Sequence, residues 1–267
     1  MTQLVDHMIN QIGAAEYDDQ PFPHLIVRRL LPAHFYEELC RSFPDKEHHA
    51  GFSHQDQIVD GQFTRFVFYV DRKEDFERLS SEQQKVWASF YRAMDSVLVK
   101  RCIFHRLQQE CPEALEQLHT QMQAVYDTAS YKITPHCDVG PGAGLGSDFG
   151  SEAETTNNPT NKYLSRLTYC PPPDADKGIG TELYVPDANG NIDGRGGVYD
   201  QMDPNNPKHF RLVKRAPYEG NALMYFVPKY GVSWHGVSAL KTSNRQRRTV
   251  QVFTKSANGI AYCPADL

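Results

Sequence analysis

From about residue 121 onward, the chain alternates short apolar runs with loops rich in Gly, Pro, Asn and Asp. The run 222–227 is apolar throughout, and apolar and polar residues alternate in 249–253. Short strands separated by turn-forming residues are typical of β-sandwiches and jelly rolls. Because an all-β fold of 267 residues is commonly one domain, we expect a single domain over residues 1–267, with its β core at about 121–260.

The first 120 residues or so combine helices with fewer strands. Segments 21–27 and 63–70 have the composition of strands, and 34–43 carries apolar residues at helical spacing. A longer helix is predicted from Ser80 or Ser81, either of which can cap its N-terminus, to about residue 97. We therefore expect a helix-rich N-terminal part over about residues 1–120.

A short polar motif, His136-Cys137-Asp138, ends one predicted strand, and His235 follows another after a turn. Side chains alternate along an extended chain, so His136 and Asp138 point to one side and Cys137 to the other. Two neutral imidazoles and one carboxylate on one face of a metal are the ligand set of Fe(II) enzymes that activate oxygen. The plainer alternative is a buried hydrogen-bonded pair and a core histidine.

Together these stretches resemble the 2-oxoglutarate/Fe(II)-dependent oxygenases, in particular their prolyl-hydroxylase-like branch. The matching stretches are 21–27, 131–138, 162–169, 180–184, 221–226, 233–237 and 247–253. The resemblance implies a double-stranded β-helix (jelly-roll) core, mainly β, with flanking helices against its outside. It also implies that His136, Asp138 and His235 bind Fe(II).

The resemblance also implies a binding site for the co-substrate 2-oxoglutarate. In the family, an arginine two residues before a Ser or Thr, on the strand after the distal histidine, holds the far carboxylate. Arg247 and Thr249 fit this pattern, and a guanidinium fork matches a carboxylate in two parallel hydrogen bonds. The spacing from His235 is longer than usual, so Arg245 and Arg248 remain alternatives.

For several further residues, the sequence is compatible with either a functional or a structural role. Tyr131 and Tyr169 lie on predicted strands, where each could bind the co-substrate or pack in the core. Trp234 is expected to pack rather than react. The Gly-rich loop 140–161 starts directly after the metal motif and is predicted to close over the substrate, the alternative being a tolerated surface insertion. A second long loop is predicted at 186–207.

The implied reaction couples oxidative decarboxylation of 2-oxoglutarate, to succinate and CO2, with O2-dependent hydroxylation or a related C–H oxidation. In related halogenases a small residue replaces the carboxylate ligand, so Asp138 favours hydroxylation over halogenation. Two alternatives stay open. One is a cupin-like metalloenzyme that does not use 2-oxoglutarate, and the other is a non-catalytic binding module on the same scaffold.

Composition and net charge indicate which classes of binding partner are expected. A formal net charge of -5 and a pI of about 6.1 disfavour nucleic acid, and no apolar run reaches membrane-spanning length. The sequence starts without a signal-peptide pattern, and its six cysteines form no C-x-x-C pair. We therefore expect a cytoplasmic enzyme with free thiols. A small-molecule substrate is the first expectation and a protein side chain the second; the oligomeric state is not indicated.

Overall fold

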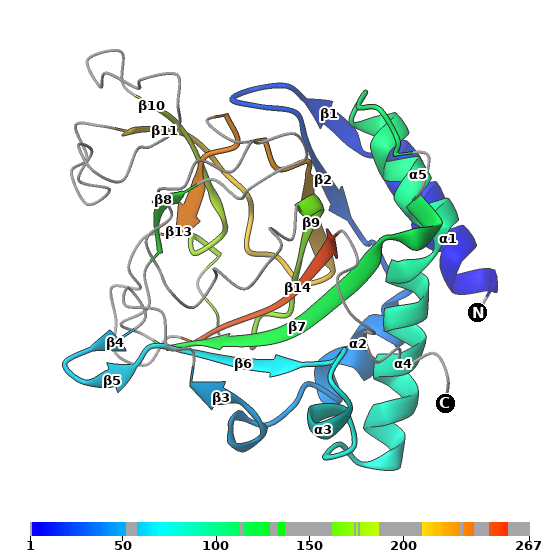
Figure 1. Ribbon diagram of the computed structural model, residues 1–267, viewed down its shortest axis with the longest axis vertical. Coiled ribbons are helices and arrows are strands. Elements are labelled where there is room, and N and C mark those ends of the chain that lie inside the picture. The colour runs from blue at the N-terminus through cyan, green and yellow to red at the C-terminus, as the bar shows by residue number, and fades with distance from the viewer. Residues whose placement is uncertain are drawn as a thin grey trace.

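The computed structural model describes residues 2–51, 58–112, 115–128, 133–136, 162–173, 175, 177–186, 210–229, 232–237 and 246–255. For residues 58–59 and 133–136 the description covers the backbone. Two antiparallel sheets form the centre of the molecule, one of eight strands and one of four (Figure 1). The prediction of a mainly β, jelly-roll core with flanking helices is confirmed.

The main sheet joins strands from both ends of the chain. Its order is β1 (Glu16–Asp18), β2 (His24–Arg28), β12 (Ala222–Phe226), β9 (Lys162–Tyr169), β14 (Arg247–Lys255), β7 (His119–Asp127), β6 (Arg65–Tyr69) and β3 (Ala50–Gly51). The second sheet has the order β11 (Phe210–Arg215), β10 (Glu182–Pro186), β13 (His235–Val237) and β8 (Ile133–His136). Strands β4 (Ile58–Val59) and β5 (Gln62–Phe63) form a separate hairpin.

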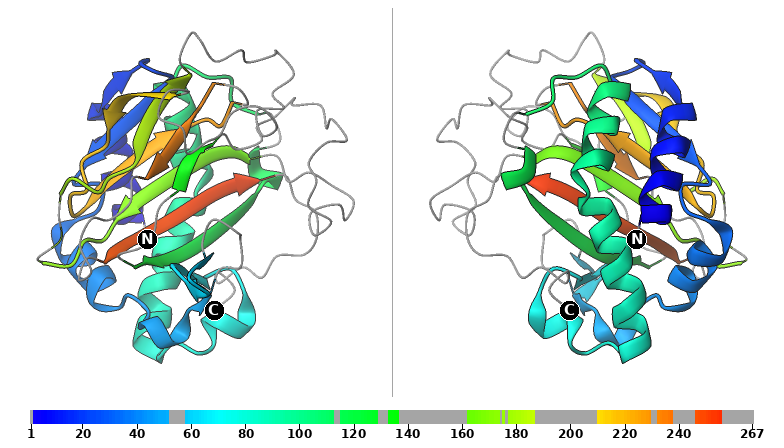
Figure 2. Two further views of the ribbon diagram at one scale, coloured as in Figure 1. Left: turned by 90° about the vertical axis from the view of Figure 1, so that its left-hand side faces the viewer. Right: turned by 90° about the vertical axis from the view of Figure 1, so that its right-hand side faces the viewer.

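The helices gather on one side of the main sheet, and the second sheet lies on the other (Figures 1 and 2). They are α1 (Thr2–Ala14), α2 (Ala33–Arg41), α3 (Lys73–Phe76), α4 (Ser81–Asp95) and α5 (Val97–Arg106), with 3-10 turns at Lys46–His48 and Leu115–Gln117. Ser80 caps α4 in a capping box with Gln83, as its position predicts. The predicted helix to residue 97 is wrong at its end, because the chain breaks at Ser96 and α5 begins.

Each face of the main sheet has its own core, because side chains alternate along every strand. On β14, Val250 and Val252 are fully buried in a cluster with Trp87 of α4, which marks the helix side. On β9, Tyr169 belongs to a second cluster together with Leu183 of the second sheet, which marks the space between the sheets. The two clusters therefore identify which side chains can face a site between the sheets.

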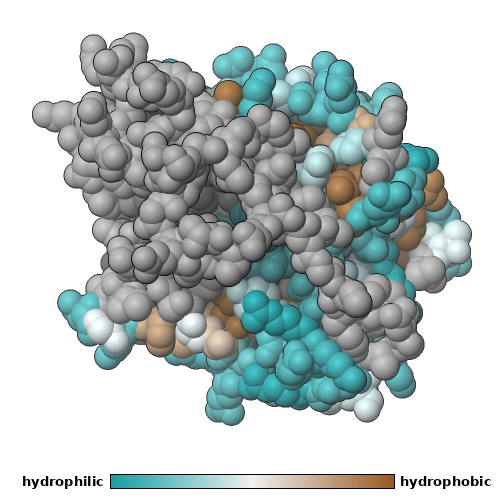
Figure 3. Space-filling view, in the orientation of Figure 1, coloured by the Kyte–Doolittle hydropathy of each residue, from teal (hydrophilic) through white to brown (hydrophobic). Residues whose placement is uncertain are grey.

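The polarity of the outer surface and of the helices bears on whether the chain spans a membrane. The described part around α3 and the adjoining end of α4 is largely hydrophilic (Figure 3). Among the described residues, no helix is both long enough and apolar enough to span a bilayer. The predicted loop 140–161 and residues 187–207 of the second predicted loop lie outside the described residues.

Candidate functional site

Strands β13 and β8 bring two of the predicted metal ligands together. His235 on β13 lies directly opposite His136 on β8 in the antiparallel register. Residues in such pairs have Cα atoms about 4.5–5.5 Å apart. Asp138 and the side chain of His136 lie outside the described part of the chain. Among the described side chains, no three His, Cys, Asp or Glu groups gather at one point.

The environment of His235 suits a metal ligand. Its ring is buried, packs edge-on against Phe226 with ring centroids 4.9 Å apart, and has Nδ1 2.9 Å from the Ser233 carbonyl oxygen. A carbonyl oxygen only accepts, so Nδ1 donates, and in the neutral ring Nε2 then carries the lone pair. Such a hydrogen bond is the usual way a protein orients a metal-binding histidine. Because Leu183 is opposite His235, the ring faces the space between the sheets.

Arg247 lies at the start of β14 and is 1% exposed. Its guanidinium donates three hydrogen bonds: Nε to the Ile179 carbonyl at 3.1 Å, Nη1 to Asp127 at 3.1 Å and Nη2 to the Thr181 hydroxyl at 3.3 Å. A guanidinium has five N–H donors. Two of them therefore have no partner among the described residues, which leaves capacity for a carboxylate ligand.

Asp127 fixes the orientation of Arg247. This carboxylate is fully buried at the end of β7, directly opposite Arg247 in the strand register. It also accepts from Arg65 on β6, through Nε at 2.8 Å and Nη2 at 3.3 Å. Two arginines on the strands that flank β7 thus share one carboxylate, and charge-assisted bonds of this kind are strong and directional.

Thr249 and two tyrosines complete this part of the site. Thr249 is fully buried on the same face of β14 as Arg247, and its hydroxyl has no hydrogen-bond partner among the described residues. The Tyr169 hydroxyl donates to the Thr181 hydroxyl at 2.8 Å, and burial raises the pKa of Tyr169, so it stays a neutral donor. The ring centroids of Tyr169 and Tyr218 lie 5.8 and 5.9 Å from the Arg247 guanidinium carbon. An unpaired buried hydroxyl beside a guanidinium is the donor set that a carboxylate would complete.

Strand geometry separates two of the three candidate arginines. Arg248 points to the helix side, where its guanidinium carbon lies 5.7 Å from the ring centroid of Phe43 and 5.9 Å from that of Tyr126. Arg245 lies outside the described residues, as does Tyr131. Of the two described arginines, Arg247 therefore faces the space between the sheets and Arg248 does not.

The two halves of the site are connected through β10. Thr181, which accepts from Arg247, precedes this strand, and Leu183 lies opposite His235. Two residues of extended chain correspond to about 7 Å. The arginine end of the site and the strand pair that carries the two histidines therefore lie a short distance apart along β10.

The sequence alone assigned no role to three residues of this arrangement. Asp127 and Tyr218 were not singled out, and Thr181 lies in a stretch that matched the family without a function of its own. Their roles depend on strand register between distant segments. Trp234, predicted to pack, is buried with its ring centroid 4.8 Å from that of Phe210.

Comparison with known proteins adds evidence on the fold. No family model matches the sequence, and no curated protein matches it. Among solved structures, the chain is similar to a prolyl 4-hydroxylase from Phytophthora capsici, with a TM-score of 0.52, 11% sequence identity, and coverage of 95% of this chain and 65% of that chain. It is also similar to the non-heme alpha ketoglutarate dependent epimerase SnoN from nogalamycin biosynthesis, with a TM-score of 0.50, 12% identity, and coverage of 95% and 83%.

The chain has the fold of the 2-oxoglutarate/Fe(II)-dependent oxygenases. The resemblance inferred from the sequence is thus confirmed at the level of fold. In this chain, the side chains of His235, Arg247 and Thr249 face the space between the two sheets.

Proposed function

We propose that this chain is a 2-oxoglutarate-dependent oxygenase, a single domain over residues 1–267 that hydroxylates a small molecule. His136, Asp138 and His235 would hold Fe(II), and Arg247 with Thr249 would hold the far carboxylate of 2-oxoglutarate. The observation that carries the proposal is the register in which His136 lies opposite His235 in a fold of this class. Two histidines paired in this way would supply the two imidazoles of the ligand set, and Asp138, two residues after His136, would supply the carboxylate.

The residues have distinct tasks in this proposal. Bound Fe(II) with 2-oxoglutarate and O2 supplies oxidative decarboxylation, giving succinate and CO2, and the oxidising power for a C–H bond. Ser233 orients His235 through its carbonyl, and Asp127 orients Arg247. The Tyr169 hydroxyl holds Thr181, which in turn accepts from Arg247, so the carboxylate donors are fixed before the co-substrate binds.

A small-molecule substrate is proposed first and a protein side chain second. SnoN is an epimerase and the Phytophthora capsici protein a prolyl 4-hydroxylase, which are consistent with either kind of substrate. The intact carboxylate at Asp138 favours hydroxylation over halogenation.

Succinate formation tests the proposal. The full chain is purified without oxygen, loaded with Fe(II), and given 2-oxoglutarate and O2, and succinate is measured over time. We expect slow, iron-dependent succinate release even without a substrate, and none from Asp138→Ala. Arg247→Lys should require more 2-oxoglutarate, while Arg248→Lys, on the opposite strand face, serves as the matched control.

Three results separate the alternatives. Iron binding without any binding of 2-oxoglutarate would favour the alternative that the chain is a cupin-like metalloenzyme. Neither iron nor 2-oxoglutarate binding would favour a non-catalytic module. A co-substrate defect in Arg248→Lys but not in Arg247→Lys would overturn the assignment of the arginine.

A further inference from the structure

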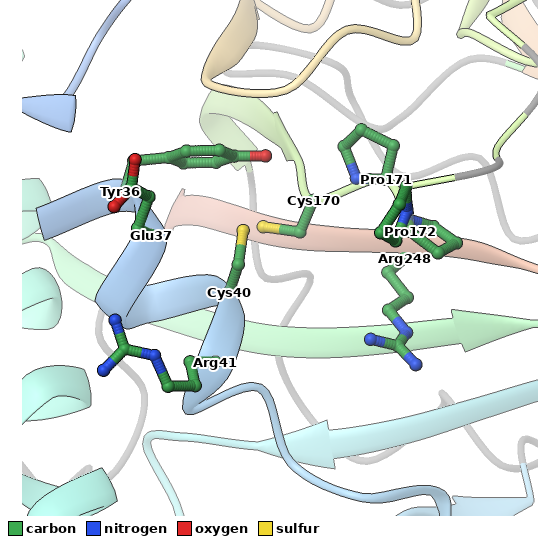
Figure 4. A pocket seen from close by; sticks show the side chains of 9 residues that line it. Tyr36, Glu37, Cys40, Arg41, Cys170, Pro171, Pro172 and Arg248 are labelled. Atoms are coloured by element: carbon green, nitrogen blue, oxygen red, sulfur yellow. The ribbon is translucent and has the colours of Figure 1, made fainter. Parts of the chain in front are cut away.

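Two cysteines far apart in the sequence meet on the helix side of the main sheet. Cys40 lies in the last turn of α2, and Cys170 directly follows β9. Their sulfur atoms point toward one another (Figure 4). Cys170 is 3% exposed and belongs to the helix-side core, while Cys40 is half-buried. This pair is separate from the side chains between the sheets.

A pocket gives access to the pair. It has a volume of about 490 Å³ and is lined by both cysteines together with Tyr36, Arg41 and Arg248, among others. A small molecule such as hydrogen peroxide is far smaller than this volume and can enter the pocket. The half-buried Cys40 is therefore the thiol that such a molecule meets first.

The surroundings favour a thiolate at Cys40. The hydrogen bond from Cys170 lowers the pKa of Cys40 to about 7, with help from the Tyr36 hydroxyl and the charge of Arg248 and against the effect of burial. The hydrogen bond to Cys40, followed by burial, raises the pKa of Cys170 well above its ordinary value. One sulfur is thus a nucleophile near neutral pH while the other keeps its proton, which is the division of roles found in reactive dithiols.

We propose that Cys40 and Cys170 form a peroxide-reactive thiol pair that closes to a disulfide between α2 and the end of β9. The Cys40 thiolate attacks a peroxide oxygen, an S–O bond forms, the O–O bond breaks, and the departing hydroxide takes a proton to give water. The Cys170 sulfur then attacks the Cys40 sulfenic acid, forming the S–S bond as the S–O bond breaks, and its proton leaves with hydroxide as a second water. Two thiols lose two electrons in total, and one hydrogen peroxide gains them.

Two other described cysteines provide the comparison. Cys102 and Cys111 hydrogen-bond to the carbonyl oxygens of Ile9 and Pro112, each at 3.9 Å. Burial raises the pKa of both thiols. Cys111 is nevertheless exposed, so it is the matched control for access without activation.

The test is a peroxide titration of the full chain, with a chelator present so that iron-derived radicals do not contribute. After quenching with an alkylating agent, non-reducing peptide mapping should find a Cys40–Cys170 disulfide at one equivalent of hydrogen peroxide, reversed by dithiothreitol. Cys111→Ser should form it equally. In Cys170→Ala, Cys40 should stop at the sulfenic acid, trapped by dimedone, and react at pH 7 roughly tenfold more slowly because its activating donor is lost.

Other outcomes would overturn the proposal. These are oxidation of Cys111 before Cys40, pairing of Cys40 with a different cysteine, or an unchanged rate in Cys170→Ala. Circular dichroism of the Cys111 and Cys170 variants establishes that they fold, and Cys40→Ala removes the nucleophile itself. The test needs neither iron nor 2-oxoglutarate, so its result is independent of the proposed oxygenase activity.

Discussion

Replacing Thr249 by valine should change stability and co-substrate binding in opposite directions. The Thr249 hydroxyl is fully buried without a hydrogen-bond partner among the described residues. A buried polar group left unpaired costs about 1–3 kcal/mol, and valine removes it while keeping nearly the same shape. The variant without ligand should therefore be more stable than the parent. If the hydroxyl donates to bound 2-oxoglutarate, the same variant should bind that ligand less tightly.

The sizes of both effects follow from the hydroxyl. A gain of 1 kcal/mol raises Tm by about 2–4 °C for a chain of this order of length. A hydrogen bond to a charged group contributes roughly 1.5–3 kcal/mol, which corresponds to about 10-fold to 150-fold in Kd. Thermal unfolding without ligand measures the first effect. Anaerobic calorimetric titration of the Fe(II)-loaded chain with 2-oxoglutarate measures the second.

Thr168→Val is a control that the structure provides. Thr168 is also fully buried, and its hydroxyl has no hydrogen-bond partner in the described part of the chain, but it lies opposite Val250 and so faces the helices. It should raise Tm comparably and leave the Kd for 2-oxoglutarate unchanged. A Thr249→Val variant that binds 2-oxoglutarate as tightly as the parent would refute the role of this hydroxyl, whatever its Tm.

Three further predictions concern other parts of the molecule. Arg247→Lys keeps the charge but loses the fork, so the Kd for 2-oxoglutarate should rise about tenfold or more in calorimetry, and an unchanged Kd would contradict this. Gly180→Ala would bring a Cβ to 1.7 Å from the Ala216 carbonyl oxygen, whereas a Cβ at Gly13 meets nothing within 4 Å; thermal unfolding should show a loss of roughly 1–3 kcal/mol for Gly180→Ala and none for Gly13→Ala. Burial lowers the pKa of His49 below 6.5, so its contribution to stability is present above pH 6.5 and lost as the pH falls through the lower folded value. In denaturant unfolding, the free energy of unfolding should accordingly fall less steeply from pH 7 to pH 5 in His49→Phe than in the parent. An identical pH dependence in the two proteins would refute this role of His49.

Local patterns in the sequence predict a good part of this arrangement. Alternation along a strand is enough to assign Arg247 and Thr249 to one face and Arg248 to the other, and the structure has them so. The break at Ser96 was not predicted, because the apolar stripe continues into the next helix and gives no stop signal.

Contacts between distant segments could not be predicted in the same way. The register of β7 against β14 brings Asp127 opposite Arg247, and no feature near Asp127 in the sequence signals that partner. The meeting of Cys40 with Cys170 depends likewise on how α2 packs against the end of β9. Register is determined by the burial of a whole strand face, so single residues carry little information about it.

Iron stoichiometry after anaerobic reconstitution tests the central claim most directly. The full chain should bind one Fe(II), and His136→Ala, Asp138→Ala and His235→Ala should each lose most of it, since three ligands hold the metal. His49→Phe, which removes a buried histidine packed against Phe43 on the helix side, should keep it. Iron binding that survives in the three ligand variants, or that is lost equally in His49→Phe, would contradict the account.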